Sequence, residues 1–192
     1  ICLEAPESDD DFYESAIAFG EFQTKLDGFP VEKLVETIPN FHNTVSRFAD
    51  FKKAVADNLS GRADTVKEEI EFVLAREKDC GVLLDLLDAG KLPLRVTHND
   101  TKLNNVMFDN DTNEGICVVD LDTVTPGLSL YDFGDSIRFG ASSAAEDEKD
   151  LSKVHFDIEL FRAYTGHFKL INCREKHVLK LGPTGGGRVN TK

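Results

Sequence analysis

The polar and apolar residues of the first ninety positions follow a helical period. Between Asp10 and Leu26, apolar side chains recur at three- and four-residue steps behind a run of aspartates that can cap the first turn. This pattern predicts an amphipathic helix over residues 10–26, which Gly28 and Pro30 end. Similar spacing predicts a short helical segment at Glu32–Glu36 and helices around Val45–Val55, Val66–Leu74 and Val82–Asp88. We expect the phenylalanine-rich faces of these helices to form the core.

The pattern changes after Pro93, where short apolar runs replace the helical spacing. These runs are rich in strand-forming residues, so we expect strands at Leu94–Val96, Val106–Phe108 and Ile116–Val119. The polar, turn-rich segment 109–115 joins the last two runs, which predicts a β-hairpin. Helical spacing returns between Ala144 and Tyr164 and predicts a helix there.

These elements predict an α+β fold that is mainly helical and contains one small hairpin. A chain of 192 residues with 41% hydrophobic content can bury one core, and we expect a single unit over residues 1–182. Residues 183–192 are Gly-rich and basic and carry no helix or strand pattern, which predicts a disordered or non-native tail. Because the sequence starts at Ile1 rather than Met, we expect a piece of a longer protein.

The charge and the cysteine content argue against several classes of function. A formal net charge of −13 and a pI near 4.8 speak against a nucleic-acid partner, because binding a polyanion requires a surplus of Lys and Arg. Cys2, Cys80, Cys117 and Cys173 stand far apart, so we expect reduced thiols rather than a zinc site or a disulfide scaffold. No apolar run is long enough to span a bilayer, and we expect a cytoplasmic protein without a membrane partner.

The residues suited to chemistry gather between His98 and Asp122. Phosphoryl transfer requires a carboxylate that takes the proton of the acceptor hydroxyl, oxygen ligands for magnesium, and in-line positioning. Asp100 suits the first role. The amide oxygen of Asn105 and the carboxylate of Asp120 are the hard donors that Mg²⁺ prefers, and they leave its other positions to phosphates and water. The sequence therefore predicts a site for ATP- and magnesium-dependent phosphoryl transfer.

Other polar residues near this segment have both a functional and a structural interpretation. Lys102 either neutralises the charge of the transferring phosphate or lies exposed on the surface. Asp122 either joins the metal ligands or caps the next turn, and Arg138 and His42 either contact sugar or phosphate or serve the structure. His98 is predicted to pack and to hydrogen-bond the loop backbone. The flanking asparagines are expected to stabilise turns through local side-chain hydrogen bonds, namely Asn99 and Asn104.

The order His-x-Asp-x-x-x-x-Asn, then a strand and then Asp is what kinase catalytic loops show. Together His98–Asn105, Val119–Asp120 and Tyr131–Asp135 are similar to the aminoglycoside phosphotransferase and choline kinase superfamily. This resemblance implies a protein-kinase-like fold, of which the chain represents the larger, C-terminal catalytic lobe. It also implies that Asp132, although it begins an Asp-Phe-Gly sequence, supports the catalytic loop through hydrogen bonds, since Asp120 already takes the metal-ligand position.

The runs Thr97–Val106, Asp120–Val124 and Asp132–Ala141, with the helical region 19–50, resemble the N-acetylhexosamine 1-kinases. The resemblance implies that ATP phosphorylates the anomeric hydroxyl of N-acetylglucosamine or N-acetylgalactosamine. Two rival hypotheses stay open. One is a kinase of another small alcohol or amino sugar, such as choline, homoserine or an aminoglycoside. The other is a truncated lobe without catalytic activity, which either binds a ligand or partner or is inert.

The sequence departs from the superfamily at both ends. No Gly-rich loop followed by a strand lysine precedes the helical region, so we expect the N-terminal lobe to be missing and the isolated chain to be inactive. The family also continues beyond the equivalent of Leu181, where further sugar contacts are expected. The sequence does not indicate which hexosamine is preferred or what the oligomeric state is.

Overall fold

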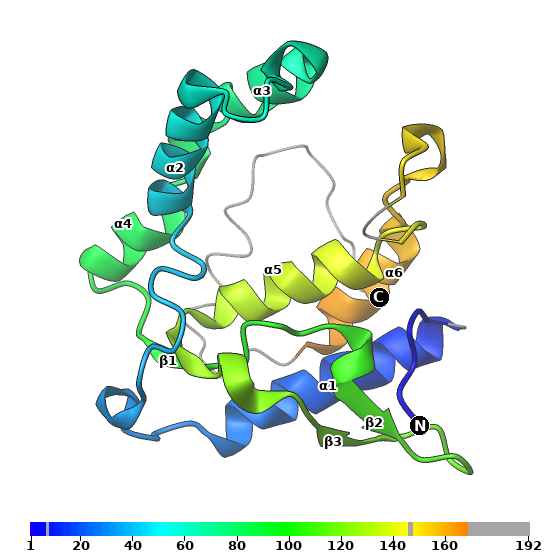
Figure 1. Ribbon diagram of the computed structural model, residues 1–192. Helices are drawn as coiled ribbons and strands as arrows, with labels where there is room; N and C mark the ends of the chain where they lie inside the picture. The colour runs from blue at the N-terminus through cyan, green and yellow to red at the C-terminus, as the bar shows by residue number, and fades with distance from the viewer. Residues whose placement is uncertain (7, 146–147, 169–192) are drawn as a thin grey trace, which may run out of the picture.

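The fold is known from a computed structural model that describes residues 1–6, 8–145 and 148–168. Its α-helices are α1 (Asp9–Lys25), α2 (Thr44–Asp57), α3 (Lys67–Leu74), α4 (Val82–Asp88), α5 (Ser129–Gly140) and α6 (Ile158–His167). Single 3₁₀ turns lie at Val31–Lys33, Ala63–Thr65, Glu77–Asp79, Leu103–Asn105, Leu121–Thr123 and Leu151–Lys153. Figure 1 shows α1, α5 and the strands close together, while α2 and α3 project away from them.

The strands form two antiparallel pairs. Strands β2 (Val106–Phe108) and β3 (Gly115–Val118) make the predicted hairpin, which is confirmed with Val106 opposite Val118 and an irregularity between Met107 and Phe108. Strand β1 (Arg95–Thr97) pairs with β4 (Thr125–Gly127). The sequence did not predict β4, because its proline and glycine disfavour strands.

Helix α1 forms where the sequence predicted it, shifted by one residue. Ser8 caps it: its hydroxyl accepts from the Asp11 N–H at 3.3 Å, and its own N–H donates to Oδ2 of Asp11 at 2.8 Å. Aspartates in the first turn also compensate the positive end of the helix dipole. The buried face of α1 includes Phe12, Ala16, Phe19 and Gln23 at helical steps.

The core lies where α1 packs against α5, α6 and β3. The rings of Phe12 and Tyr164 are fully buried, and their centroids are 4.6 Å apart. Side chains from the turn before β2, from the hairpin and from the residue between β4 and α5 complete the core, namely Leu103, Val106, Phe108 and Leu128. Burial of these apolar groups holds the hairpin and the loop before it against α1. It stabilises the fold by about 25 cal/mol of free energy per Å² of apolar surface removed from water.

The phenylalanine-rich faces are core in α1 but only partly so in the later helices. Phe48 is the buried residue of α2, whereas Phe72 of α3 is 58% exposed. The guanidinium of Arg76 lies over the Phe72 ring, 3.3 Å from its centroid, and covers one side of it. The prediction that these faces are core is therefore wrong for α3.

The prediction of a helix between Ala144 and Tyr164 is wrong over much of its length. Helix α6 begins at Ile158, where the Asp157 carboxylate caps it by accepting from the N–H groups of Glu159 and Leu160. Of the apolar residues that gave helical spacing, Ile158 and Phe161 lie in α6, whereas Leu151 lies in the turn Leu151–Lys153 and Val154 directly follows that turn. A bridge between Ser142 and Phe156 further shows that this segment folds back on itself.

The predicted α+β class is confirmed, with helices predominating over the short strands. Among the residues that the structure describes, no helix is both long and apolar enough to cross a membrane. Cys2, Cys80 and Cys117 are free thiols. The predicted boundary at residue 182, the predicted tail at 183–192, and Cys173 lie outside the described residues.

Two glycines of α5 give a matched test of the packing between α5 and α1. A Cβ at Gly140 would collide with the Phe12 ring, whereas one at Gly134 would meet nothing within 4 Å. We expect Gly140→Ala to lower the free energy of unfolding by about 1–3 kcal/mol through overpacking. Gly134→Ala is expected to raise it by up to about 1 kcal/mol, because alanine favours the helix. Urea denaturation measures both, and equal effects at the two positions would contradict the packing described.

Candidate active site

The loop that follows β1 turns sharply at Asn99, whose backbone φ is 69°. Asparagine adopts this left-handed conformation more readily than most residues. Its side-chain nitrogen donates to the Thr123 carbonyl oxygen and to the Thr125 hydroxyl, each at 2.9 Å. Its carbonyl oxygen accepts from Nε2 of His42 at 2.9 Å. The turn is therefore fixed on one side by the β4 region and on the other by the segment before α2.

His98 is fully buried inside this loop. Its Nε2 lies 2.9 Å from the Val119 carbonyl oxygen, and since a carbonyl can only accept, Nε2 carries the proton. Its Nδ1 then accepts from the Asp100 N–H at 3.3 Å. The ring also packs edge-on against Phe19 and Phe22 of α1. His98 thus links the loop, the end of β3 and α1.

Asp100 presents a partly exposed carboxylate beside the turn, with 26% of its side chain accessible. Oδ1 lies 3.2 Å from Nζ of Lys102. The Asn105 side-chain nitrogen donates to Oδ2 of Asp100 at 3.1 Å and to its carbonyl oxygen at 2.8 Å. Three of the predicted site residues are therefore in direct contact.

Asn105 and Asp120 belong to two loops that a backbone hydrogen bond connects. The Val119 N–H donates to the Asn105 carbonyl oxygen at 2.9 Å, and Asp120 is the next residue. Asp120 has a left-handed backbone with φ 59° and ψ 63°, and it is exposed. This conformation ends the extended path of β3 directly beside Asn105.

The donors around this point fit a hard divalent cation. Because the Asn105 amide nitrogen donates to Asp100, its amide oxygen faces away from Asp100. An amide oxygen and a carboxylate are ligands that Mg²⁺ accepts. In the described part of the chain, no three His, Cys, Asp or Glu side chains gather into a metal site.

Asp132 lies in the first turn of α5, and it is completely buried. Its Oδ2 accepts from Nε2 of Gln23 at 2.7 Å and from the His98 N–H at 3.0 Å, and its Oδ1 accepts from the Asn99 N–H at 2.8 Å. Burial raises the pKa of the Asp132 carboxyl above its usual value, and the donated hydrogen bonds act in the opposite direction. These contacts hold the two residues that precede Asp100.

The sequence did not assign a role to several residues that hold the same loop. Thr101 donates from its N–H to Oδ2 of Asp135 at 2.9 Å and from its hydroxyl to the Asp132 carbonyl oxygen at 2.6 Å. Gln23 was detectable in principle, because it is a polar residue four positions after Phe19 on the buried face of α1. Asp135 lies one helical turn after Asp132, which is recognisable only once α5 is known to be a helix.

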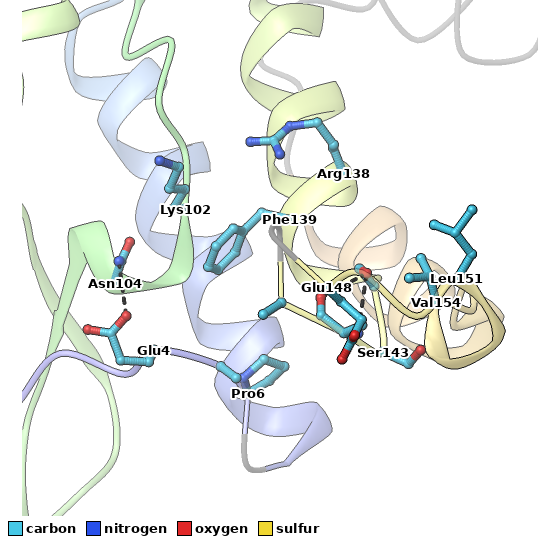
Figure 2. Close-up of a pocket in the computed structure, with 14 residues that line it drawn as sticks. Glu4, Pro6, Lys102, Asn104, Arg138, Phe139, Ser143, Glu148, Leu151 and Val154 are labelled. Carbon is cyan, nitrogen blue, oxygen red and sulfur yellow. Dashed lines mark hydrogen bonds between the residues drawn. The ribbon is translucent and has the colours of Figure 1, made fainter. Parts of the chain in front are cut away.

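Two pockets meet at Lys102 and Arg138. One has a volume of about 540 Å³ and is lined by Asp100, together with Phe41, His42, Thr44, Arg47, Asn99 and Asp135. The larger, of about 890 Å³, lies beside Phe139 and the first residues of the chain, with Lys102 and Arg138 at one end (Figure 2). Arg138 donates to Oδ1 of Asp135 from Nε at 3.0 Å and from Nη2 at 2.9 Å.

Two other polar residues from the sequence analysis lie apart from these contacts. Asp122 is exposed within the turn Leu121–Thr123, and its carbonyl oxygen accepts from the Thr37 hydroxyl at 3.2 Å. Within the described residues, the Asn104 side-chain oxygen is buried without a hydrogen-bond partner. The Asn104 side-chain nitrogen donates to Glu4 at 3.4 Å (Figure 2).

Comparison with known protein families gives a match that spans most of the chain. The model of the phosphotransferase enzyme family matches residues 3–167. The matched range contains every residue of the loop, hairpin and α5 contacts described above.

Replacing the buried carboxylate of Asp132 tests how strongly it holds the loop. In Asp132→Asn, one oxygen becomes an NH₂ group that faces a backbone or Gln23 donor. We expect the free energy of unfolding to fall by about 2–4 kcal/mol in urea denaturation, because buried donors lose their acceptor. The control is Asp57→Asn, which removes an exposed pair with Lys53 and should change stability by less than about 0.5 kcal/mol. A similar small change at Asp132 would show that these hydrogen bonds contribute little.

Proposed function

The chain belongs to the phosphotransferase enzyme family, and on this premise we propose that it transfers the terminal phosphoryl group of ATP to a hydroxyl of a small sugar. The family acts on small-molecule substrates and uses ATP and a divalent metal. We further propose that the acceptor is a sugar, that the metal is magnesium, and that individual residues of the loop and hairpin have the roles given below.

The contact between Asp100 and Asn105 is the observation that carries this proposal. One loop holds a partly exposed carboxylate and, 3.1 Å away, the side-chain amide of Asn105, and a backbone hydrogen bond from Val119 connects Asn105 to the loop that carries Asp120. A purely structural loop would have no need of a partly exposed charged group held in this way, since such a group loses side-chain entropy for little stability. Phosphoryl transfer requires this combination of a base and oxygen ligands at close range.

Asp100 is proposed to act as the general base. As the acceptor hydroxyl oxygen forms its bond to the terminal phosphorus, the bond from that phosphorus to the bridging oxygen breaks and ADP leaves. The hydroxyl proton passes to the Asp100 carboxylate. The Asn105 amide holds this carboxylate in place, and Lys102, with Nζ 3.2 Å from Oδ1, brings a positive charge close to the transferred group.

Asn105 and Asp120 are proposed to hold magnesium. When bound, the ion neutralises phosphate charge and orients the terminal phosphoryl group. The side chains of the hairpin beside them offer an apolar surface to the base of the nucleotide. Met107 and Ile116 of the hairpin are exposed, with Ile116 60% accessible, and Leu121 is exposed in the turn that follows the hairpin.

The pocket that contains Asp100 is proposed to receive the acceptor. Its volume of about 540 Å³ suits a small molecule. Its lining combines the rings of Phe41 and His42 with the charged groups of Asp135 and Arg138. A sugar presents hydroxyls to such polar groups and C–H faces to such rings. The resemblance to N-acetylhexosamine 1-kinases further favours N-acetylglucosamine or N-acetylgalactosamine, phosphorylated at the anomeric hydroxyl.

Substitutions in the full-length protein test the residue roles. Asp100→Asn is expected to lower kcat about 10²- to 10⁴-fold with little change in nucleotide affinity, because it removes the base without altering shape. Asp120→Ala is expected to abolish magnesium-dependent turnover. Asp111→Asn, an exposed carboxylate in the hairpin turn, is the control and should leave turnover unchanged. Near-normal kcat in Asp100→Asn would remove the base role from Asp100.

A panel of acceptors tests the substrate assignment. With ATP and magnesium, we expect the full-length protein to phosphorylate N-acetylglucosamine or N-acetylgalactosamine, read as ADP release and as a sugar 1-phosphate in the phosphorus NMR spectrum. N-acetylhexosamines blocked by a 1-O-methyl group are the matched control and should not react. Turnover of choline, homoserine or an aminoglycoside in place of the hexosamines would select the rival acceptor and reject the sugar.

A further inference from the structure

Tyr164 of α6 packs into the core between α1 and α5, close to the candidate active site. The side chain is fully buried, and its ring packs against Phe12 of α1 and Phe133 of α5 at centroid distances of 4.6 and 5.9 Å. Its hydroxyl donates to the Ser136 hydroxyl oxygen at 2.7 Å. Ring packing alone would be served by phenylalanine, so the buried hydroxyl requires a separate explanation.

Ser136 connects Tyr164 to the loop next to Asp100 through a second hydrogen bond. Its hydroxyl donates to the Thr101 carbonyl oxygen at 3.0 Å, and its side chain is 1% exposed. Thr101 is the residue directly after Asp100, and Asp132 and Asp135 already bind its hydroxyl and its N–H. The hydrogen bond from Ser136 therefore completes the restraint on all three polar groups of Thr101.

A serine hydroxyl within a helix has an alternative acceptor, the carbonyl oxygen four residues earlier in its own helix. For Ser136 that oxygen belongs to Asp132. Because the Ser136 oxygen accepts from Tyr164, the orientation of its O–H group is restricted, and the hydrogen points to Thr101. Burial also raises the pKa of Tyr164 far above its usual value, so the phenol remains a donor throughout the working pH range.

We propose that Tyr164 is a positioning residue for the phosphoryl-transfer site, acting through Ser136 on the Thr101 carbonyl and thus on the backbone that presents Asp100. The catalytic part of this inference rests on the proposed function. Its physical part does not, since it states that a hydroxyl on α6 restrains a loop near β1. The orientation of a general base decides whether its oxygen reaches the acceptor hydroxyl, and small displacements reduce the rate strongly.

The experiment compares Tyr164→Phe, Ser136→Ala and the double variant with wild type in the full-length protein. Amide hydrogen exchange at Thr101 reports restraint of the loop, and kcat with KM for ATP reports catalysis. We expect Tyr164→Phe to speed Thr101 exchange about three- to tenfold and to lower kcat about five- to fiftyfold, with KM for ATP changed less than about twofold. The double variant should match Ser136→Ala, because Tyr164 acts through Ser136.

Ser15→Ala is the matched control, since it removes a buried hydroxyl bond to the Phe12 carbonyl oxygen within α1. It should lower stability by an amount similar to Tyr164→Phe without changing Thr101 exchange or kcat. If Tyr164→Phe behaves like this control, or if its effect on kcat simply adds to that of Ser136→Ala, the inference is overturned. If wild type transfers phosphate to no acceptor, the proposed function fails, and the exchange comparison alone decides whether Tyr164 restrains the loop.

Discussion

The fold around the site depends on one buried carboxylate, that of Asp132. A fully buried charge is unfavourable unless donors surround it. Here the donors come from Gln23 on α1 and from two successive backbone N–H groups of the loop after β1. The carboxylate itself belongs to α5. Removing any of these partners would leave the buried carboxylate short of a donor, so α1, α5 and the loop are positioned together, and the partly exposed Asp100 is fixed as a consequence.

The sequence predicted correctly those elements whose capping residues, apolar spacing and turn residues all indicate the structure that they adopt in the fold. The hairpin at 106–118 combines strand-forming runs with a turn-rich link, and α1 combines a cap with an apolar stripe. Helix α5 was not predicted, because it contains two glycines and two aspartates, which are residues with low helix propensity. Its stability comes from tertiary contacts: Asp132, Asp135 and Ser136 are all bound by the loop. The prediction of one helix over 144–164 failed although the apolar residues do recur at helical steps. The Asp157 side chain caps a helix that begins only at Ile158, so the residues before it are not part of α6.

The candidate site was predictable to the extent that it is local in the sequence. Asp100, Lys102 and Asn105 lie within one short loop, and their contact follows from its length. Gln23 lies more than a hundred residues from its partner Asp132, and no periodicity in either segment indicates that they meet. The same holds for Tyr164 and Ser136. Long-range polar contacts of this kind are set by how the helices pack, which a single sequence does not reveal.

The left-handed backbone at Asp120 also limits which side chains this position can accept over evolutionary time. At φ 59° a branched or long side chain is strained, whereas aspartate, asparagine and glycine are tolerated. Glutamate would keep the negative charge yet suit the backbone poorly, and asparagine would suit the backbone yet lose the charge. Main-chain geometry therefore restricts this position to a few residue types, and under the proposed metal-binding role the need for a negative charge would restrict it further, so it has fewer neutral mutational paths than its exposure to solvent suggests.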